Sequence, residues 1–185
     1  PVMATMAFFT REDLDPVISR IRNYSIYQPY LKKPGEKVVA GFDVGKRRNP
    51  SHFVVFVGGE NEHLTCIHQS FWDNVEYTEQ VVRIQAAIDN FGIDKMYIDN
   101  TRGEMDERGL PRECIPIKFT GRGERNQGSF ATDFAKKVEK KEITLPDDDR
   151  FLSQITCVTN DLKAPESPLG HGDSFWSVAL AVGVW

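Results

Sequence analysis

The chain has 185 residues, of which 40% are hydrophobic, and this suits one domain with a substantial core. It carries 27 acidic and 23 basic residues, and the net charge of −4 argues against a wholly basic, histone-like nucleic-acid binder. A local basic path over DNA stays compatible with that sum, because such a footprint depends on clustering. The three cysteines form no C-x-x-C pair, which indicates reduced thiols in a cytosolic protein, and no apolar stretch predicts a membrane span.

The first 37 residues are predicted to form an arm or linker that leads into the domain. Thr10 is a typical N-cap residue, which predicts a helix over residues 11–22. Residues 23–37 combine two prolines and a glycine with tyrosines and lysines and are typical of a connector. We therefore expect the domain itself to comprise residues 38–185.

Three antiparallel strands are expected at the start of this domain. Apolar and β-branched residues predict strands over 38–44, 52–57 and 64–71, joined by short polar turns. Helical periodicity then predicts a helix over 78–91, and the next strand covers 94–99. A helix between two strands favours a parallel crossover connection.

Shorter strands and helices are predicted to alternate in the second half of the chain. The expected strands cover 114–119 and 143–146, and the expected helices cover 129–141, 150–156 and 173–182. The last helix is rich in small and apolar residues, so we expect it to be buried against the sheet. A three-strand antiparallel meander, a helix and further parallel strands make an α/β fold with a ribonuclease-H-like mixed sheet flanked by helices.

Three aspartates occur at comparable places in this order of elements. Asp43 ends the first strand, Asp99 ends the fourth, and Asp173 begins the last helix. In a ribonuclease-H-like sheet the first and fourth strands are neighbours, so their ends lie together. An oxygen-only ligand set suits hard divalent ions such as Mg²⁺ or Mn²⁺. Two such ions, about 3.5–4 Å apart, can clamp the attacking water and the leaving oxygen of a phosphodiester.

Each aspartate also has a purely structural interpretation. A strand-terminal aspartate is often a turn former, and an aspartate at a helix start is often an N-cap. Taken singly, each residue favours the structural interpretation. Three of them in a topology that brings them together favour the metal site.

Three stretches resemble the nuclease domain of the large terminase subunit of tailed bacteriophages. They are Val-Ala-Gly-Phe-Asp-Val-Gly at 39–45, Met-Tyr-Ile-Asp-Asn-Thr at 96–101, and His-Gly-Asp-Ser-Phe-Trp-Ser-Val-Ala-Leu-Ala at 171–181. The resemblance covers about residues 38–185. It implies an endonuclease of little sequence preference that cuts concatemeric viral DNA during packaging, with Mg²⁺ or Mn²⁺ bound at the three aspartates. The implied partners are double-stranded DNA, the portal and the small terminase subunit, in the host cytoplasm.

Two departures from the family pattern matter. Some members carry an additional acidic residue beside the third aspartate, whereas His171 and Gly172 precede it here. A second ion is then expected to bind weakly, or only when DNA contributes phosphate oxygens. The chain also has no G-x-x-x-x-G-K-[ST] motif, so it resembles the nuclease half alone, with residues 1–37 as a remnant of the interdomain linker. An ATPase motor domain is expected upstream.

His171 and several basic residues are further site candidates. His171 is interpreted as a weak metal ligand, a phosphate contact or a proton donor to the leaving oxygen, or else as a solvated loop histidine. Basic side chains near the acidic pocket would hold the DNA backbone without reading its sequence, although each also suits ordinary solubility. The candidates for DNA contacts are Lys46, Arg47, Arg48, Arg102, Arg122 and Arg125.

Two other functions stay open from the sequence. The first is a non-catalytic DNA- or partner-binding module of the same fold. The second, weaker possibility is an actin-like nucleotide-binding fold, which would need a second, duplicated half that 185 residues do not supply.

Overall fold

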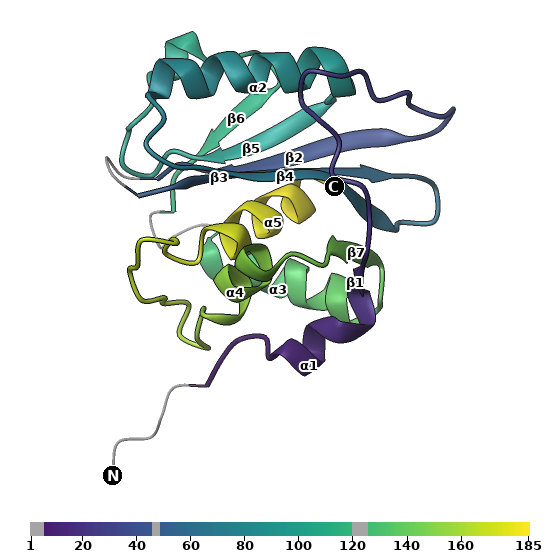
Figure 1. The fold of residues 1–185 in the computed structure, drawn as a ribbon, viewed down its shortest axis with the longest axis vertical. Helices are drawn as coiled ribbons and strands as arrows, with labels where there is room; N and C mark the ends of the chain where they lie inside the picture. The colour runs from purple at the N-terminus through teal and green to yellow at the C-terminus, as the bar shows by residue number, and fades with distance from the viewer. Residues whose placement is uncertain (1–5, 46–48, 120–125) are drawn as a thin grey trace.

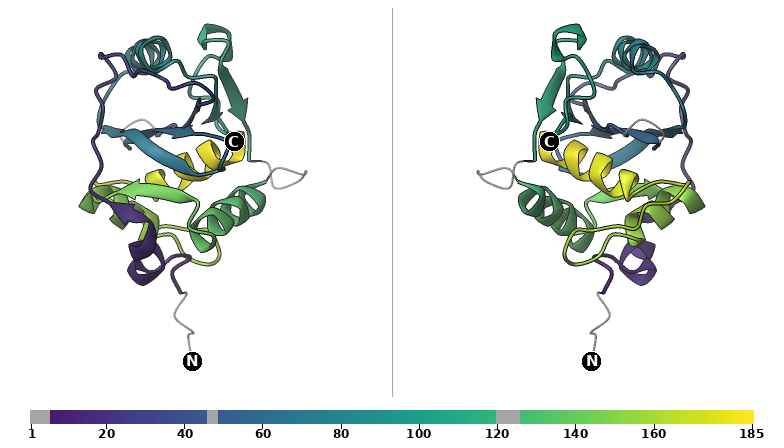
Figure 2. Two further views of the ribbon diagram at one scale, coloured as in Figure 1. Left: turned by 90° about the vertical axis from the view of Figure 1, so that its right-hand side faces the viewer. Right: turned by 90° about the vertical axis from the view of Figure 1, so that its left-hand side faces the viewer.

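A seven-stranded mixed sheet with helices on both faces forms the described part of the chain (Figures 1 and 2). The computed structural model describes residues 6–45, 49–119 and 126–185. The strands are β1 Ile18–Ser19, β2 Lys37–Asp43, β3 Ser51–Gly58, β4 Leu64–Trp72, β5 Lys95–Asp99, β6 Cys114–Ile117 and β7 Ile143–Pro146. The helices are α1 Arg11–Leu14, α2 Tyr77–Phe91, α3 Gln127–Glu139, α4 Asp149–Thr156 and α5 Asp173–Val184, with 3₁₀ turns at Asp15–Val17 and Glu107–Gly109.

The strand order is β1-β7-β4-β3-β2-β5-β6, and it confirms the predicted ribonuclease-H-like arrangement. β2, β3 and β4 form the antiparallel meander. β5 then pairs in parallel with β2, and β6 pairs in parallel with β5. Asp43 and Asp99 are register partners at the carboxyl ends of β2 and β5. The predicted neighbourhood of the first and fourth strands is therefore confirmed.

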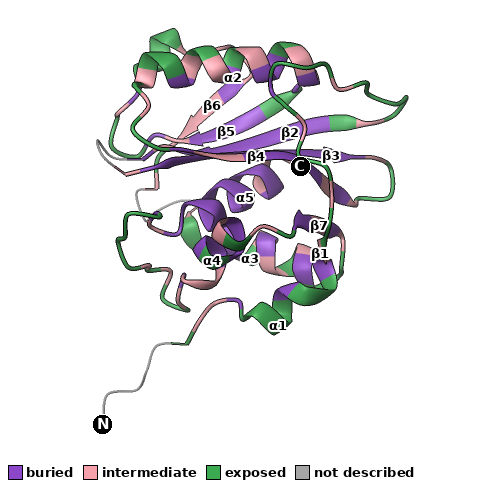
Figure 3. Cartoon of the chain, viewed as in Figure 1, coloured by how far each residue is buried: buried purple, intermediate pink, exposed green. Residues whose placement is uncertain are grey.

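Each face of the sheet has its own apolar core. On one face, Phe42 and Phe53 of the strands pack with Ile84 and other residues of α2. On the other face, α5 lies directly beneath the sheet, with α3 and α4 outside it (Figure 2). Because α5 is covered on all sides, ten of its residues are buried, and β2, β3 and α5 are purple in Figure 3. The predicted burial of the last helix is confirmed.

The N-terminal segment differs from its prediction. Thr10 does cap a helix, through a capping box with Asp13, but α1 ends at Leu14 and does not run on to residue 22. Pro16 is the physical reason, because its ring blocks the helical turn and it lacks the N–H that the next intrahelical bond needs. The chain instead makes a 3₁₀ turn and the two-residue strand β1, which pairs in parallel with β7.

Residues of this segment also contribute to the core. Phe9, Leu14 and Val17 are buried on the α5 side of the sheet, and Ile26 is buried on the α2 side. A two-residue strand has no detectable periodicity, which is why the sequence did not predict β1. The division of the chain at residue 37 stays a prediction. None of the helices that the structure describes is long and apolar enough to cross a membrane.

Candidate active site

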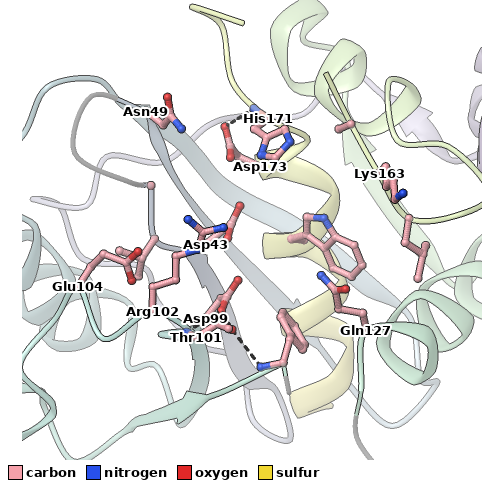
Figure 4. A pocket seen from close by; sticks show the side chains of 16 residues that line it. Asp43, Asn49, Asp99, Thr101, Arg102, Glu104, Gln127, Lys163, His171 and Asp173 are labelled. Atoms are coloured by element: carbon pink, nitrogen blue, oxygen red, sulfur yellow. Dashed lines mark hydrogen bonds between the residues drawn. The ribbon is translucent and has the colours of Figure 1, made fainter. Parts of the chain in front are cut away.

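The three predicted aspartates line one pocket. It has a volume of about 410 Å³ and lies where β2 and β5 end and α5 begins (Figure 4). Asp43 lies between Asp99 and Asp173 in this view. The structure therefore brings together the carboxylates that the sequence singled out from three distant segments.

Close contact between α5 and β2 sets the separation of Asp43 from Asp173. A Cβ atom at Gly41 would overlap the carbonyl oxygen of Ser177 and lie 2.7 Å from the Ala181 nitrogen, so only glycine admits the helix backbone here. Gly41 and Asp43 share a strand face, and Asp173 and Ser177 share a helix face. The Gly41–Ser177 contact consequently aligns the two aspartates at the open end of the interface.

Asp99 is oriented by the chain that follows it. Its Oδ1 accepts hydrogen bonds from the backbone N–H of Thr101 at 3.0 Å and from the Thr101 hydroxyl. The same hydroxyl oxygen accepts from the Phe119 N–H at 2.9 Å. Asn100 holds this turn by hydrogen bonds in both directions with the backbone of Met105. The carboxylate is thus fixed by neighbours on two loops.

Asp173 sits on a tight glycine-flanked turn. Gly170 and Gly172 have φ values of +142° and +74°, which side chains rarely adopt. The His171 N–H donates to Asp173 Oδ2 at 3.1 Å, and the Gly172 N–H donates to Gln154 Oε1 at 2.9 Å. A Cβ atom at Gly170 would overlap Asp173 Oδ2. The turn therefore wraps the backbone around the carboxylate.

Burial concentrates negative charge at this pocket. Burial and then the charges of Asp173 and Asp99, with hydrogen bonding to both, raise the pKa of Asp43 well above its usual range. Burial also raises the pKa of Asp173, against the opposing effect of the His171 N–H. Carboxylates held this close and this dry are stabilised by a proton or by a cation.

The donor set fits a hard divalent cation, since every candidate ligand atom is a carboxylate oxygen. Within residues 6–45, 49–119 and 126–185, no group of three His, Cys, Asp or Glu side chains is spaced to hold one metal ion. The aspartates instead lie in a row, with Asp43 interacting with each of the other two. This arrangement suits two pairs of ligands that share Asp43.

The remaining predicted site residues fall into two groups. His171 and Arg102 both line the pocket, on different sides of Asp43 (Figure 4). The others, Lys46, Arg47, Arg48, Arg122 and Arg125, lie outside the described residues. A role for any of them in catalysis or in DNA contact stays a prediction.

The pocket also includes residues that sequence reasoning did not select. Glu104, read as part of a solvated loop, lines the pocket beside Arg102, and Lys163 and Gln127 lie across from them (Figure 4). Trp176, read as a packing residue, forms part of the wall. These positions lie in loops or on a wholly apolar helix, where hydrophobic periodicity carries no signal for the side that faces a pocket.

A three-layer α/β fold with acidic residues at the ends of two neighbouring parallel strands and at a helix start defines the ribonuclease-H-like nuclease class. Within that class, the chain has the fold of the nuclease domains of phage large terminases. No family model and no curated protein matches the sequence.

Solved structures match nearly the whole chain. The large terminase nuclease of thermophilic phage G20c, with bound magnesium, matches with a TM-score of 0.69 and 20% identity over 99% of this chain and 98% of that one. The nuclease domain of the Thermus phage P74-26 large terminase matches with a TM-score of 0.63 and 19% identity over 91% of each chain. The large terminase of bacteriophage HK97 matches with a TM-score of 0.68 and 13% identity, over 98% of this chain but 44% of that one.

Proposed function

We propose that this protein is a divalent-metal-dependent endodeoxyribonuclease that cuts concatemeric viral DNA during genome packaging. The observation that carries the proposal is the row of buried carboxylates, Asp99, Asp43 and Asp173, in one pocket. The shared fold supports it, since the G20c nuclease has been solved with magnesium, with cobalt and with zinc.

Mg²⁺ or Mn²⁺ is the expected cofactor, held by carboxylate oxygens. Asp43 and Asp173 would hold one ion, and Asp43 and Asp99 would hold a second. Bound there, two ions would supply Lewis-acid stabilisation to the attacking water and to the leaving oxygen of a phosphodiester. The second ion is expected to bind weakly, or only with DNA, because His171 and Gly172 precede the third aspartate.

The chain's own residues would hold and orient the DNA strand. Arg102 and Lys163, on opposite walls of the pocket, are suited to phosphate contacts, which position a strand without reading its sequence. His171 lies beside Asp173 and is the candidate for giving a proton to the leaving oxygen. Little sequence preference is therefore expected.

The proposed partners follow from the same fold. HK97 large terminase is more than twice as long as the region that matches, and the large terminase of another thermophilic bacteriophage has been solved in complex with ADP. We expect an ATPase motor domain upstream of this chain, and the portal and small terminase subunit as assembly partners in the host cytoplasm. Double-stranded DNA is the expected substrate.

Plasmid cleavage tests the proposal directly. Supercoiled DNA is incubated with the wild type, in Mn²⁺ and separately in Mg²⁺, and relaxed and linear products are measured. Cleavage is expected from the wild type and not from Asp43→Asn, which removes one ligand charge with little change of shape. DNA that is bound but stays intact in both metals would instead support the non-catalytic module. Cleavage that survives Asp43→Asn would contradict the site.

Arg102→Ala is expected to weaken DNA binding without changing metal affinity. Removal of one phosphate contact should lower the slope of log affinity against log salt concentration by about one unit. Arg112→Ala is the matched control, because Arg112 is exposed and precedes β6, at the edge of the sheet away from the pocket. Fluorescence anisotropy with a DNA duplex at several salt concentrations measures both variants. An equal loss of affinity in both would contradict a specific role for Arg102.

Metal binding is expected to release protons from the pocket. The pKa values of Asp43 and Asp173 are both raised, so the metal-free site keeps protons at pH values where free aspartate is ionised. An incoming cation must displace them, and Mn²⁺ affinity should fall as pH falls through the raised pKa values. Calorimetric titration on either side of neutral pH, in buffers of different ionisation enthalpy, measures affinity and proton release together. An affinity that changes with neither pH nor buffer would contradict the expectation.

A further inference from the structure

A buried histidine, His52, lies beside the proposed metal site and takes no part in it. It is the register partner of Asp43 on the adjacent strand β3, so both side chains project from the same face of the sheet toward α5. Its ring is wholly buried and contacts the rings of Phe71 and Phe151. Burial lowers its pKa to about 3, so the imidazole is neutral.

Both ring nitrogens of His52 have hydrogen-bond partners. Nε2 lies 2.7 Å from Gln69 Oε1, and Nδ1 lies 2.5 Å from Ser177 Oγ. An amide oxygen only accepts, so Nε2 carries the proton and Nδ1 accepts from the Ser177 hydroxyl. Asn23 holds the backbone of Gln69 through two hydrogen bonds, at 2.8 and 3.1 Å. The tautomer and the direction of the Nδ1 lone pair are therefore fixed from behind.

Ser177 lies one helical turn after Asp173, on the same face of α5. The side chain of Ser177 is hydrogen-bonded to His52, and its carbonyl lies against Gly41. At the next turn, Asp173 faces Asp43, whose pKa is raised in part by the charge of Asp173. The repulsion between these carboxylates pushes the first turn of α5 away from the sheet. The His52–Ser177 hydrogen bond acts in the opposite direction, about one turn further along.

We propose that His52 is a positioning residue that, through Ser177, holds α5 against the sheet so that Asp173 and Asp43 stay close enough to share a divalent ion. This role rests on the metal-dependent function proposed above. His52 touches neither the ion nor the DNA.

Two substitutions of His52 separate its two hydrogen bonds. Asparagine places a polar atom near Nδ1 and can keep the bond to Ser177 while losing Gln69. Glutamine reaches the position of Nε2 and can keep Gln69 while losing Ser177. Each variant loses one bond and part of the ring, so they are matched in packing. His68→Gln is the control, because His68 is also buried but bonds Tyr24 and Ser70 and packs against Phe53 and Phe91 on the α2 side of the sheet.

Mn²⁺ affinity, measured by calorimetry, and stability to urea without metal are the two readouts. His52→Gln should lose about tenfold in Mn²⁺ affinity, the loss typical when a residue that orients a metal ligand is removed. His52→Asn and His68→Gln should bind Mn²⁺ nearly as the wild type does, although both lose stability. Ser177→Ala should match His52→Gln, and the double variant should lose no more than either single variant.

The outcomes distinguish this role from the function on which it depends. Equal Mn²⁺ affinity in wild type, His52→Gln and Ser177→Ala would overturn the positioning role and leave the nuclease proposal intact. Equal losses in His52→Asn and His52→Gln would also overturn it, because packing alone would then explain the effect. A wild type that binds Mn²⁺ no better than Asp43→Asn would overturn the proposed function itself. If His52→Gln does not fold, Ser177→Ala against wild type decides.

Discussion

Asn in place of Asp43 is expected to make the metal-free protein more stable and to remove its response to metal. Burial and two neighbouring carboxylates raise the pKa of Asp43, so the folded state binds this proton more tightly than the unfolded state does. Stability is therefore lost as pH rises from the ordinary aspartate pKa through the raised one. Asparagine is neutral at every pH, and the stability gap between variant and wild type should widen with pH.

Thermal unfolding with and without Mn²⁺ measures this effect. Each kcal/mol shifts the melting temperature of a chain of this size by about 2–4 °C, so a rise of a few degrees is detectable in the metal-free variant. Metal should reverse the order, since an ion at a hundred times its dissociation constant stabilises the wild type by about 2.7 kcal/mol. Asp89→Asn, an exposed charge change on α2, should change neither value. A metal-free Asp43→Asn protein that is less stable than wild type at all pH values would contradict the electrostatic account.

Gly41→Ala is expected to be the most damaging single-methyl change in the described part of the molecule. The new Cβ would overlap the Ser177 carbonyl oxygen and crowd the Ala181 nitrogen, and both are backbone atoms of a helix that cannot rotate away. α5 must then lift from β2, which should cost about 2–3 kcal/mol and lower the melting temperature by roughly 4–12 °C. Because Asp173 moves with α5, cleavage should fall by about a hundredfold or more, as expected when a ligand is displaced by about 1 Å.

A glycine in open surroundings provides the control for this substitution. Gly109→Ala adds the same methyl group where no atom lies within 4 Å, and its stability should stay within about 0.5 kcal/mol of wild type. Urea unfolding and Mn²⁺-dependent plasmid cleavage are measured for both variants. Wild-type cleavage by Gly41→Ala would show that α5 is not held at β2 as described.

The central sheet was predictable because its information is local. Val38 to Asp43 and Lys95 to Asp99 are apolar runs that end in a carboxylate, and the helix between β4 and β5 implied a parallel crossover. The N-terminal helix was predicted too long although Pro16 is visible in the sequence, because the N-cap signal at Thr10 was weighted over the proline that stops the helix.

The walls of the site were less predictable. Glu104 and Lys163 lie in loops without periodicity, and their shared pocket depends on where two distant loops meet. His52 begins a strand that is buried along its whole length, so alternation along the chain did not distinguish it from its apolar neighbours.

By itself, the sequence determined the order of the elements and the placing of an aspartate at the end of two strands and at the start of a helix. These features follow from side-chain periodicity and chain punctuation, which act over a few residues. Only the tertiary structure decided that Asp43 stands between the other two carboxylates and that His52 meets Ser177, 125 residues further along the chain. Contacts across such separations depend on how whole helices and strands pack, and no short stretch of sequence records that packing.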